Sequence, residues 1–133
     1  MIGLLDTSTV LLASRMTDPS VLPDRPMICT VTLAELSVGP LIATGEDERA
    51  RRQAQVQQAE ARFDPLPFDA QAARAFGRVA ASLHASGQKP TARTFDAMIA
   101  AVALANDLPL YTCNSSDFDG IDGLTVVSVP QPG

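Results

Sequence analysis

The sequence is poor in the residues that form zinc sites and disulfides. Its 133 residues include one histidine, His84, and two cysteines, Cys29 and Cys113. The cysteines lie far apart, follow no metal-binding spacing and fall in predicted strands, so we expect buried free thiols. His84 falls near the end of a predicted helix, where a surface residue favoured by the helix dipole is the ordinary case. The scarcity of these donors argues against zinc.

Aromatic residues and long apolar runs are also scarce. Aromatics make up 5% of the chain and tryptophan is absent, although 46% of the residues are hydrophobic. The core must therefore consist of Leu, Val, Ile and Ala, which suits helices stacked on a sheet. No apolar run approaches membrane-spanning length, and no basic leader precedes the early carboxylate of Asp6. We expect one domain over residues 1–133, with a loose tail at 130–133, no membrane segment and a cytoplasmic location.

Positive charge is unevenly distributed along the chain. The net charge is −5, yet eight of the ten basic residues lie between residues 44 and 93, which leaves both flanks acidic. This pattern fits an acidic metal-binding centre with a phosphate-binding rim, and it fits solvated helix faces equally well.

Strand-like and helix-like segments alternate in the first half. An apolar run over residues 2–5 ends in the carboxylate of Asp6, which can cap a helix that starts directly afterwards. Residues 27–31 predict a second strand, and Thr32 with Glu35 forms a capping-box pattern for the next helix. Gly39 and Pro40 predict a kink or break. A largely polar helix then starts within residues 44–48 and runs to about residue 62.

The second half continues the alternation. Residues 63–68 contain two prolines and predict a short edge strand or extended linker. Asp69 can cap an alanine-rich helix that ends near Gly87, and residues 88–93 should form a loop. A buried helix follows from Thr94 with Asp96 in its first turn. Strands are expected over residues 108–113 and 124–129.

This alternation predicts an α/β fold in three layers, α/β/α, with a mainly parallel central sheet. The carboxyl ends of parallel strands share one edge, where ligands bind in open α/β sheets. That edge should gather four carboxylates, which would repel one another unless a cation lay among them. The candidates are Asp6, Glu35, Asp96 and either Asp117 or Asp119.

Mg²⁺ or Mn²⁺ would suit such an oxygen-only set, and a carboxylate-bound ion with open positions suits phosphoryl chemistry. The alternative is four unrelated helix caps and surface acids.

Four motifs in register resemble the PIN domain over nearly the whole chain, and more closely a VapC-type toxin ribonuclease of a bacterial toxin–antitoxin pair. The motifs are Leu5-Asp6-Thr7-Ser8, Ala34-Glu35-Leu36 with Gly39, Asp96-Ala97-Met98-Ile99-Ala100-Ala101, and Thr112-Cys113-Asn114-Ser115-Ser116-Asp117-Phe118.

The resemblance implies a role for each acid and for several neighbours. Asp6, Glu35, Asp96 and Asp117 would bind Mg²⁺ or Mn²⁺ and form the catalytic centre, with Asp119 in reserve for the fourth position. Thr7 or Thr112 would assist by hydrogen bonding. Asn114 stands where many relatives carry the fourth acid, and Cys113 stands where relatives often carry a basic residue.

The resemblance also implies an activity and partners. A metal-activated water would cleave structured RNA, commonly transfer or ribosomal RNA. The protein would form a homodimer, and the C-terminal segment of a VapB-type antitoxin would occupy its groove. The polar helix over residues 49–62 fits a partner surface or an RNA contact equally well.

Three alternatives differ in class. A phosphoacceptor receiver domain also uses strand-end carboxylates and Mg²⁺, but it needs a lysine after a late strand, and the only lysine, Lys89, precedes a helix. A PIN-like module that binds RNA or a partner without cleaving it is the second. A metal nuclease acting on DNA is the third, because no residue identifies a reader of the 2′-hydroxyl.

Overall fold

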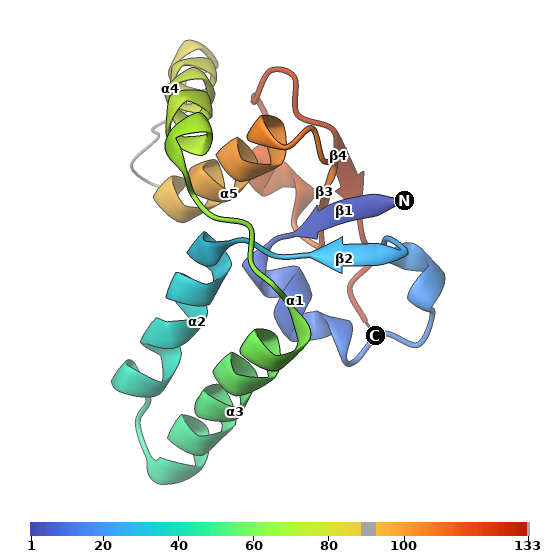
Figure 1. Cartoon of the computed structure of the whole chain (residues 1–133), viewed down its shortest axis with the longest axis vertical. Coiled ribbons are helices and arrows are strands. Elements are labelled where there is room, and N and C mark those ends of the chain that lie inside the picture. Colours follow the sequence, from blue (N-terminus) through green and yellow to red (C-terminus); the bar gives the residue numbers. More distant parts are fainter. Residues whose placement is uncertain (89–92, 133) are drawn as a thin grey trace.

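A computed structural model describes residues 1–88 and 93–132 (Figure 1). Residues 89–92 of the loop predicted at 88–93, including Lys89, therefore lie outside the described residues. The same holds for residue 133, the last of the predicted tail. In chain order the elements are β1 (Ile2–Leu5), α1 (Thr7–Ala13), η1 (Pro19–Val21), β2 (Arg25–Met27), α2 (Thr30–Ile42), α3 (Glu46–Arg62), α4 (Ala70–Ala85), α5 (Thr94–Ala105), β3 (Leu110–Thr112), η3 (Ser115–Phe118) and β4 (Val126–Ser128).

The four strands form one parallel sheet in the order β2-β1-β3-β4. Leu4 of β1 pairs with Met27 of β2 on one side and with Leu110 of β3 on the other. Parallel neighbours require crossover connections, which the helices between the strands supply. The carboxyl ends of all four strands therefore lie at one edge, which confirms the predicted sheet.

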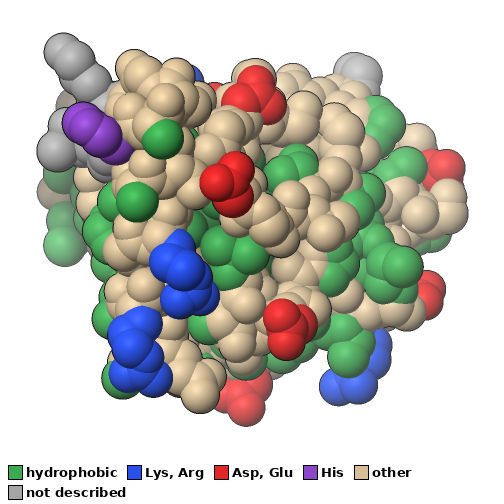
Figure 2. All heavy atoms as spheres, turned by 90° about the horizontal axis from the view of Figure 1, so that it is seen from above, with side chains coloured by type: hydrophobic (Ala, Val, Ile, Leu, Met, Phe, Trp, Pro, Cys, Tyr) green, Lys and Arg blue, Asp and Glu red, His purple; other side chains and the backbone are tan. Residues whose placement is uncertain are grey.

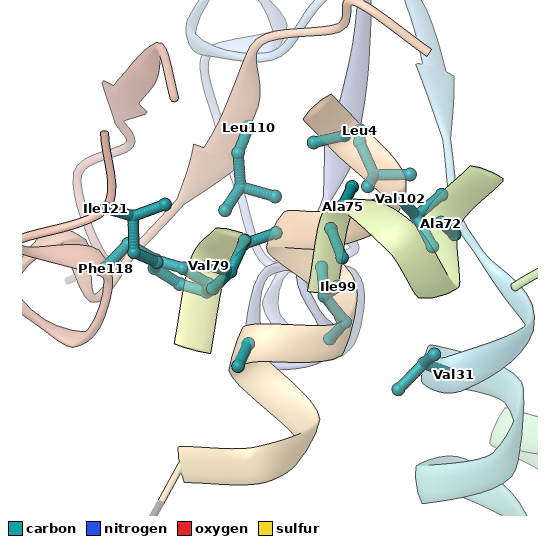
Figure 3. Close-up of a cluster of buried hydrophobic side chains, with 14 of the residues drawn as sticks. Leu4, Val31, Ala72, Ala75, Val79, Ile99, Val102, Leu110, Phe118 and Ile121 are labelled. Carbon is teal, nitrogen blue, oxygen red and sulfur yellow. The ribbon is translucent and has the colours of Figure 1, made fainter. Parts of the chain in front are cut away.

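Helices cover both faces of the sheet, so the predicted three layers are confirmed. Figure 1 shows α4 and α5 on one side of the strands and α1 on the other. On the first side Leu4 and Leu110 pack against residues of α4 and α5 such as Val79 and Val102 (Figure 3). On the other side Leu5 and the Tyr111 ring form a smaller cluster. Strands buried on both faces explain the short, almost wholly apolar runs.

Helices α2 and α3 pair and project away from the sheet (Figure 1). Of the predicted kink or break at Gly39 and Pro40, the break is wrong, because α2 continues to Ile42 with Pro40 inside it. Arginines of α3 stabilise this last turn: Arg52 Nη1 donates to the Gly39 carbonyl at 3.0 Å and Arg49 Nε to the Pro40 carbonyl at 3.3 Å. Carbonyls of the last turn have no partner within the helix, so these donors satisfy them.

The second strand and the start of α2 also differ from the prediction. β2 ends at Met27, and Cys29 precedes the first turn of α2, so Thr32 lies inside the helix and the capping box with Glu35 is wrong. The backbone around Ile28 binds the segment after α3 instead: Leu66 N donates to the Ile28 carbonyl at 2.9 Å and Thr30 N to the Leu66 carbonyl at 2.9 Å. This tertiary pairing takes precedence over the local pattern.

Several smaller predictions agree with the structure. Both cysteines are free, Cys29 fully buried and Cys113 partly. Asp69 caps α4 by accepting from Ala72 N at 3.0 Å. The single histidine lies at the surface (Figure 2). Within the described ranges, no helix is long and apolar enough to cross a membrane.

Candidate acidic active site

Asp6 lies where β1 passes into α1 and is only 4% exposed. Its Oδ1 accepts from Thr9 N at 3.1 Å, which makes it the N-cap of α1. Its Oδ2 accepts from Thr112 Oγ1 of β3 at 2.7 Å. The capping role and the position at the carboxyl edge are therefore compatible, because each uses a different oxygen.

Glu35 reaches the same edge from the second turn of α2. Its Oε1 accepts from Thr7 Oγ1 at 2.7 Å, and Thr7 Oγ1 also lies 3.1 Å from Thr32 Oγ1. Burial raises the pKa of Glu35, the Thr7 hydrogen bond opposes this, and the charge of Asp6 raises it further. Glu35 and Asp6 therefore share one electrostatic environment.

Asp96 is the acid whose pKa is affected by the other three. It lies half-buried in the first turn of α5. Burial is the largest of the effects that raise the pKa of Asp96 to about 6, and the charges of Asp117, Glu35 and Asp6 follow in that order. A carboxyl whose pKa responds to three other acids lies close to all of them. The other three predicted acids thus lie near enough to Asp96 for their charges to act on it.

The structure favours Asp117 over Asp119 as the fourth acid of this cluster. Asp117 lies in η3 after β3, and its Oδ1 accepts an ion-paired hydrogen bond from Arg93 Nη1. Asp119 is exposed and is not among the acids whose charges raise the pKa of Asp96. Its backbone carbonyl accepts from Gln88 Nε2 at 2.9 Å. The functional roles of these acids stay predictions.

Two further side chains belong to this edge: Asn114, which the resemblance places where relatives carry the fourth acid, and Arg93. Asn114 Nδ2 donates to Ser8 Oγ at 3.0 Å, and Ser8 Oγ lies 3.4 Å from Asp6 Oδ2. Asn114 N also donates to Thr112 Oγ1 at 2.9 Å, so Asn114 supports the acids without being one. Arg93 was not predicted as part of the site, although its position three residues before Asp96 places it in the same turn.

The donor chemistry of the cluster fits a hard divalent cation. All four side chains offer carboxylate oxygens, and burial first and repulsion among the acids second raise the pKa of Asp96 and Glu35, so a bound cation would stabilise their charged forms. In the part of the chain that the structure describes, no three His, Cys, Asp or Glu side chains already form a metal-binding group. Thr7 and Thr112 each use one of the roughly four acceptor positions of a carboxylate, so Glu35 and Asp6 keep positions for an ion while they are held in place.

Comparison with known proteins identifies the class to which this fold and site belong. The PIN domain family matches residues 4–124, a range that contains all four acids, and the chain belongs to this family. It is 40% identical to Ribonuclease VapC5 of Mycobacterium tuberculosis over 129 residues, which cover 96% of this chain and 93% of that protein. The resemblance to VapC ribonucleases is therefore confirmed, and the receiver-domain alternative is wrong.

Solved structures agree with the sequence comparison. The VapBC-5 toxin–antitoxin structure from Mycobacterium tuberculosis matches with a TM-score of 0.82 and 38% identity, covering 96% of this chain and 98% of that one. The DNA-bound VapBC structure from Salmonella typhimurium matches with a TM-score of 0.75 and 27% identity, covering 95% and 97%.

Proposed function

We propose that this chain is the toxin of a type II toxin–antitoxin pair and acts as a metal-dependent endoribonuclease in the cytoplasm. The observation that carries the proposal is the placement of Asp6, Glu35 and Asp117 near enough to Asp96 for their charges to act on it, in a chain 40% identical to a VapC ribonuclease over nearly its whole length. Hydrolysis of an RNA phosphodiester is the reaction that such a site suits.

The four acids would hold Mg²⁺, with Mn²⁺ as a substitute. A divalent ion there would lower the pKa of water and neutralise charge on the scissile phosphate. The chain's own contribution is preorganisation. Thr112 and the Thr9 amide fix the Asp6 carboxylate, and Thr7 fixes Glu35. Donors that hold the oxygens in place reduce the reorganisation needed when an ion or substrate binds.

A groove between α1 and α3 suits the antitoxin. It encloses about 270 Å³ and is lined by both apolar and polar side chains. Its lining residues include the apolar Val10, Leu11, Leu22 and Phe63 and the polar Arg51, Gln58 and Arg62. An amphipathic segment with apolar anchors and acidic neighbours would complement such a surface. The known VapBC structures contain both toxin and antitoxin, which supports the assignment of a VapB-type partner.

The arginines of α3 have two different roles. Arg49 and Arg52 bind carbonyls at the end of α2 and are structural, whereas Arg51 and Arg62 face the groove. Substitution of Arg51 and Arg62 together by Ala should weaken antitoxin binding with little effect on the fold. The expected homodimer stays a prediction, which light scattering on the purified chain would measure.

Cleavage of RNA by the purified chain, freed of antitoxin, tests the proposal directly. Total bacterial RNA, with transfer and ribosomal RNA resolved, is incubated with Mg²⁺, Mn²⁺ or EDTA, and the new ends are mapped. The Asp6→Asn variant removes one proposed ligand. The matched control is Asp64→Asn, a change at an exposed acid in the linker between α3 and α4. A parallel reaction contains single-stranded DNA of matched length.

Discrete ends in wild type and Asp64→Asn, only with metal and absent in Asp6→Asn, are expected. Cutting that persists in EDTA would contradict the metal centre. Cutting of DNA alone would favour the deoxyribonuclease alternative. No cutting of either nucleic acid by protein with a verified fold would favour a module that only binds.

A further inference from the structure

Arg93 is a cation placed directly at the acidic cluster. It precedes the first turn of α5, and its guanidinium pairs with Asp117 Oδ1. Its charge also lowers the pKa of Asp96, against the effect of the three neighbouring acids. Arg93 is therefore close to two of the four proposed ligands. The other ion pairs among the described residues join the N-terminus to Asp24 and Glu48 to arginines of its own helix.

The ion pair between Arg93 and Asp117 is weak and can open easily. The side chain of Arg93 is 43% exposed and that of Asp117 is 32% exposed, so opening the pair costs little. A divalent ion among the acids would attract the Asp117 carboxylate and repel the guanidinium, because both cations would lie within a few ångströms of the same charges. Metal binding should therefore release Arg93.

A released Arg93 would lie at the partly exposed rim of the site. Its planar fork of N–H donors matches the oxygens of a phosphate, a geometry that lysine does not offer. At the strand end itself, between Thr112 and Asn114, the chain carries Cys113. Cys113 cannot bind a phosphate by charge, so a phosphate contact has to come from elsewhere.

We propose that Arg93 alternates between two anions: it pairs with Asp117 in the metal-free site, and it binds an RNA phosphate once Asp117 has turned to a divalent ion. The inference rests on the metal-dependent ribonuclease function proposed above. It assigns Arg93 two opposite effects, since the residue competes with the metal but assists the substrate.

Substitution of Arg93 separates these effects. In Arg93→Gln, calorimetric titration with Mn²⁺ alone should show binding about two- to fivefold tighter than in wild type, the range expected for loss of one exposed ion pair. The initial rate of RNA cleavage at saturating Mn²⁺ and low RNA concentration, which is proportional to kcat/KM, should fall about tenfold. Arg93→Lys should bind Mn²⁺ as wild type does and recover only part of the rate.

The matched control is Arg25→Gln. Arg25 is an exposed arginine in the first position of β2, opposite Ile2 at the amino edge of the sheet, and its loss should change neither quantity. Weaker Mn²⁺ binding in Arg93→Gln would overturn the proposal and make Arg93 a residue that orients Asp117 for the metal. Unchanged binding or an unchanged cleavage rate would overturn it too. Failure of wild type itself to bind Mn²⁺ would overturn the metal centre and this inference together.

Discussion

At the scale of single residues, the ionised acids of the site lower the free energy of unfolding of the metal-free protein. The pKa of Asp96 is raised from 3.8 to about 6, so the folded chain binds its proton more tightly than the unfolded chain does. Stability of the metal-free protein should therefore fall as pH rises from about 4 through 6, because the ionised carboxylate is disfavoured in the folded state. Glu35, whose pKa is also raised, acts in the same direction.

Asp96→Asn should consequently stabilise the metal-free protein while it abolishes cleavage. A pKa of about 6 in place of 3.8 would correspond to roughly 3 kcal/mol, and solvent screening at this half-buried site reduces our expectation to about 1–2 kcal/mol at pH 7.5. Urea unfolding in EDTA measures the difference, which should shrink at pH 4.5. Asp64→Asn serves as the control, and a destabilised Asp96→Asn would contradict this account of the site.

Thr112 has the opposite effect, because it stabilises a buried charge. Its hydroxyl donates to Asp6 Oδ2 at 2.7 Å, and both residues are buried. Thr112→Val keeps the shape and removes the donor, so we expect a loss of about 1–3 kcal/mol in the free energy of unfolding. Thr112→Ser should restore most of the loss in the same denaturation experiment. Equal stability of the valine variant would show that Asp6 finds another donor.

At the scale of elements, the α2–α3 hairpin depends on long-range hydrogen bonds. Arg52 donates both to the Gly39 carbonyl and to Glu48, whereas Arg51 pairs with Glu48 alone among the described residues and its side chain is 65% exposed. Arg52→Met should cost roughly 1 kcal/mol of stability, and Arg51→Met should stay within about 0.5 kcal/mol. Thermal unfolding of the two variants is a matched comparison, and an equal loss in both would remove the special role of Arg52.

The same elements show what the sequence could and could not reveal. The alternation of strands and helices, the shared edge and the four acids were all predictable, because each rests on local patterning and on the geometry of parallel sheets. The continuation of α2 through Pro40 was not, because its donors come from a different helix. The start of α2 was misplaced for a similar reason, since Leu66 pairs with the backbone beside Ile28. The pairing of Arg93 with Asp117 likewise spans 24 positions.

At the scale of the whole molecule, the fold and the metal are thermodynamically linked. Four carboxylates from α1, α2, α5 and η3 meet only when the sheet and its helices are assembled, so the unfolded chain offers no equivalent site. A ligand that binds only the folded state stabilises it, by roughly 2.7 kcal/mol at one hundred times its Kd. In a chain of this size that corresponds to a rise in Tm of about 8–10 °C.

Mn²⁺ should therefore raise the Tm of wild type in calorimetry, and Asp6→Asn should lose most of the rise because it lacks one proposed ligand. Asp96→Asn makes the more demanding comparison. It should start from a higher Tm than wild type in EDTA and gain less from Mn²⁺, so that the order of stability of the two proteins reverses as the ion is added. An equal rise in all three proteins would place the bound metal outside the acidic cluster. The reversal follows only if the same carboxylates that destabilise the metal-free fold are those that bind the ion.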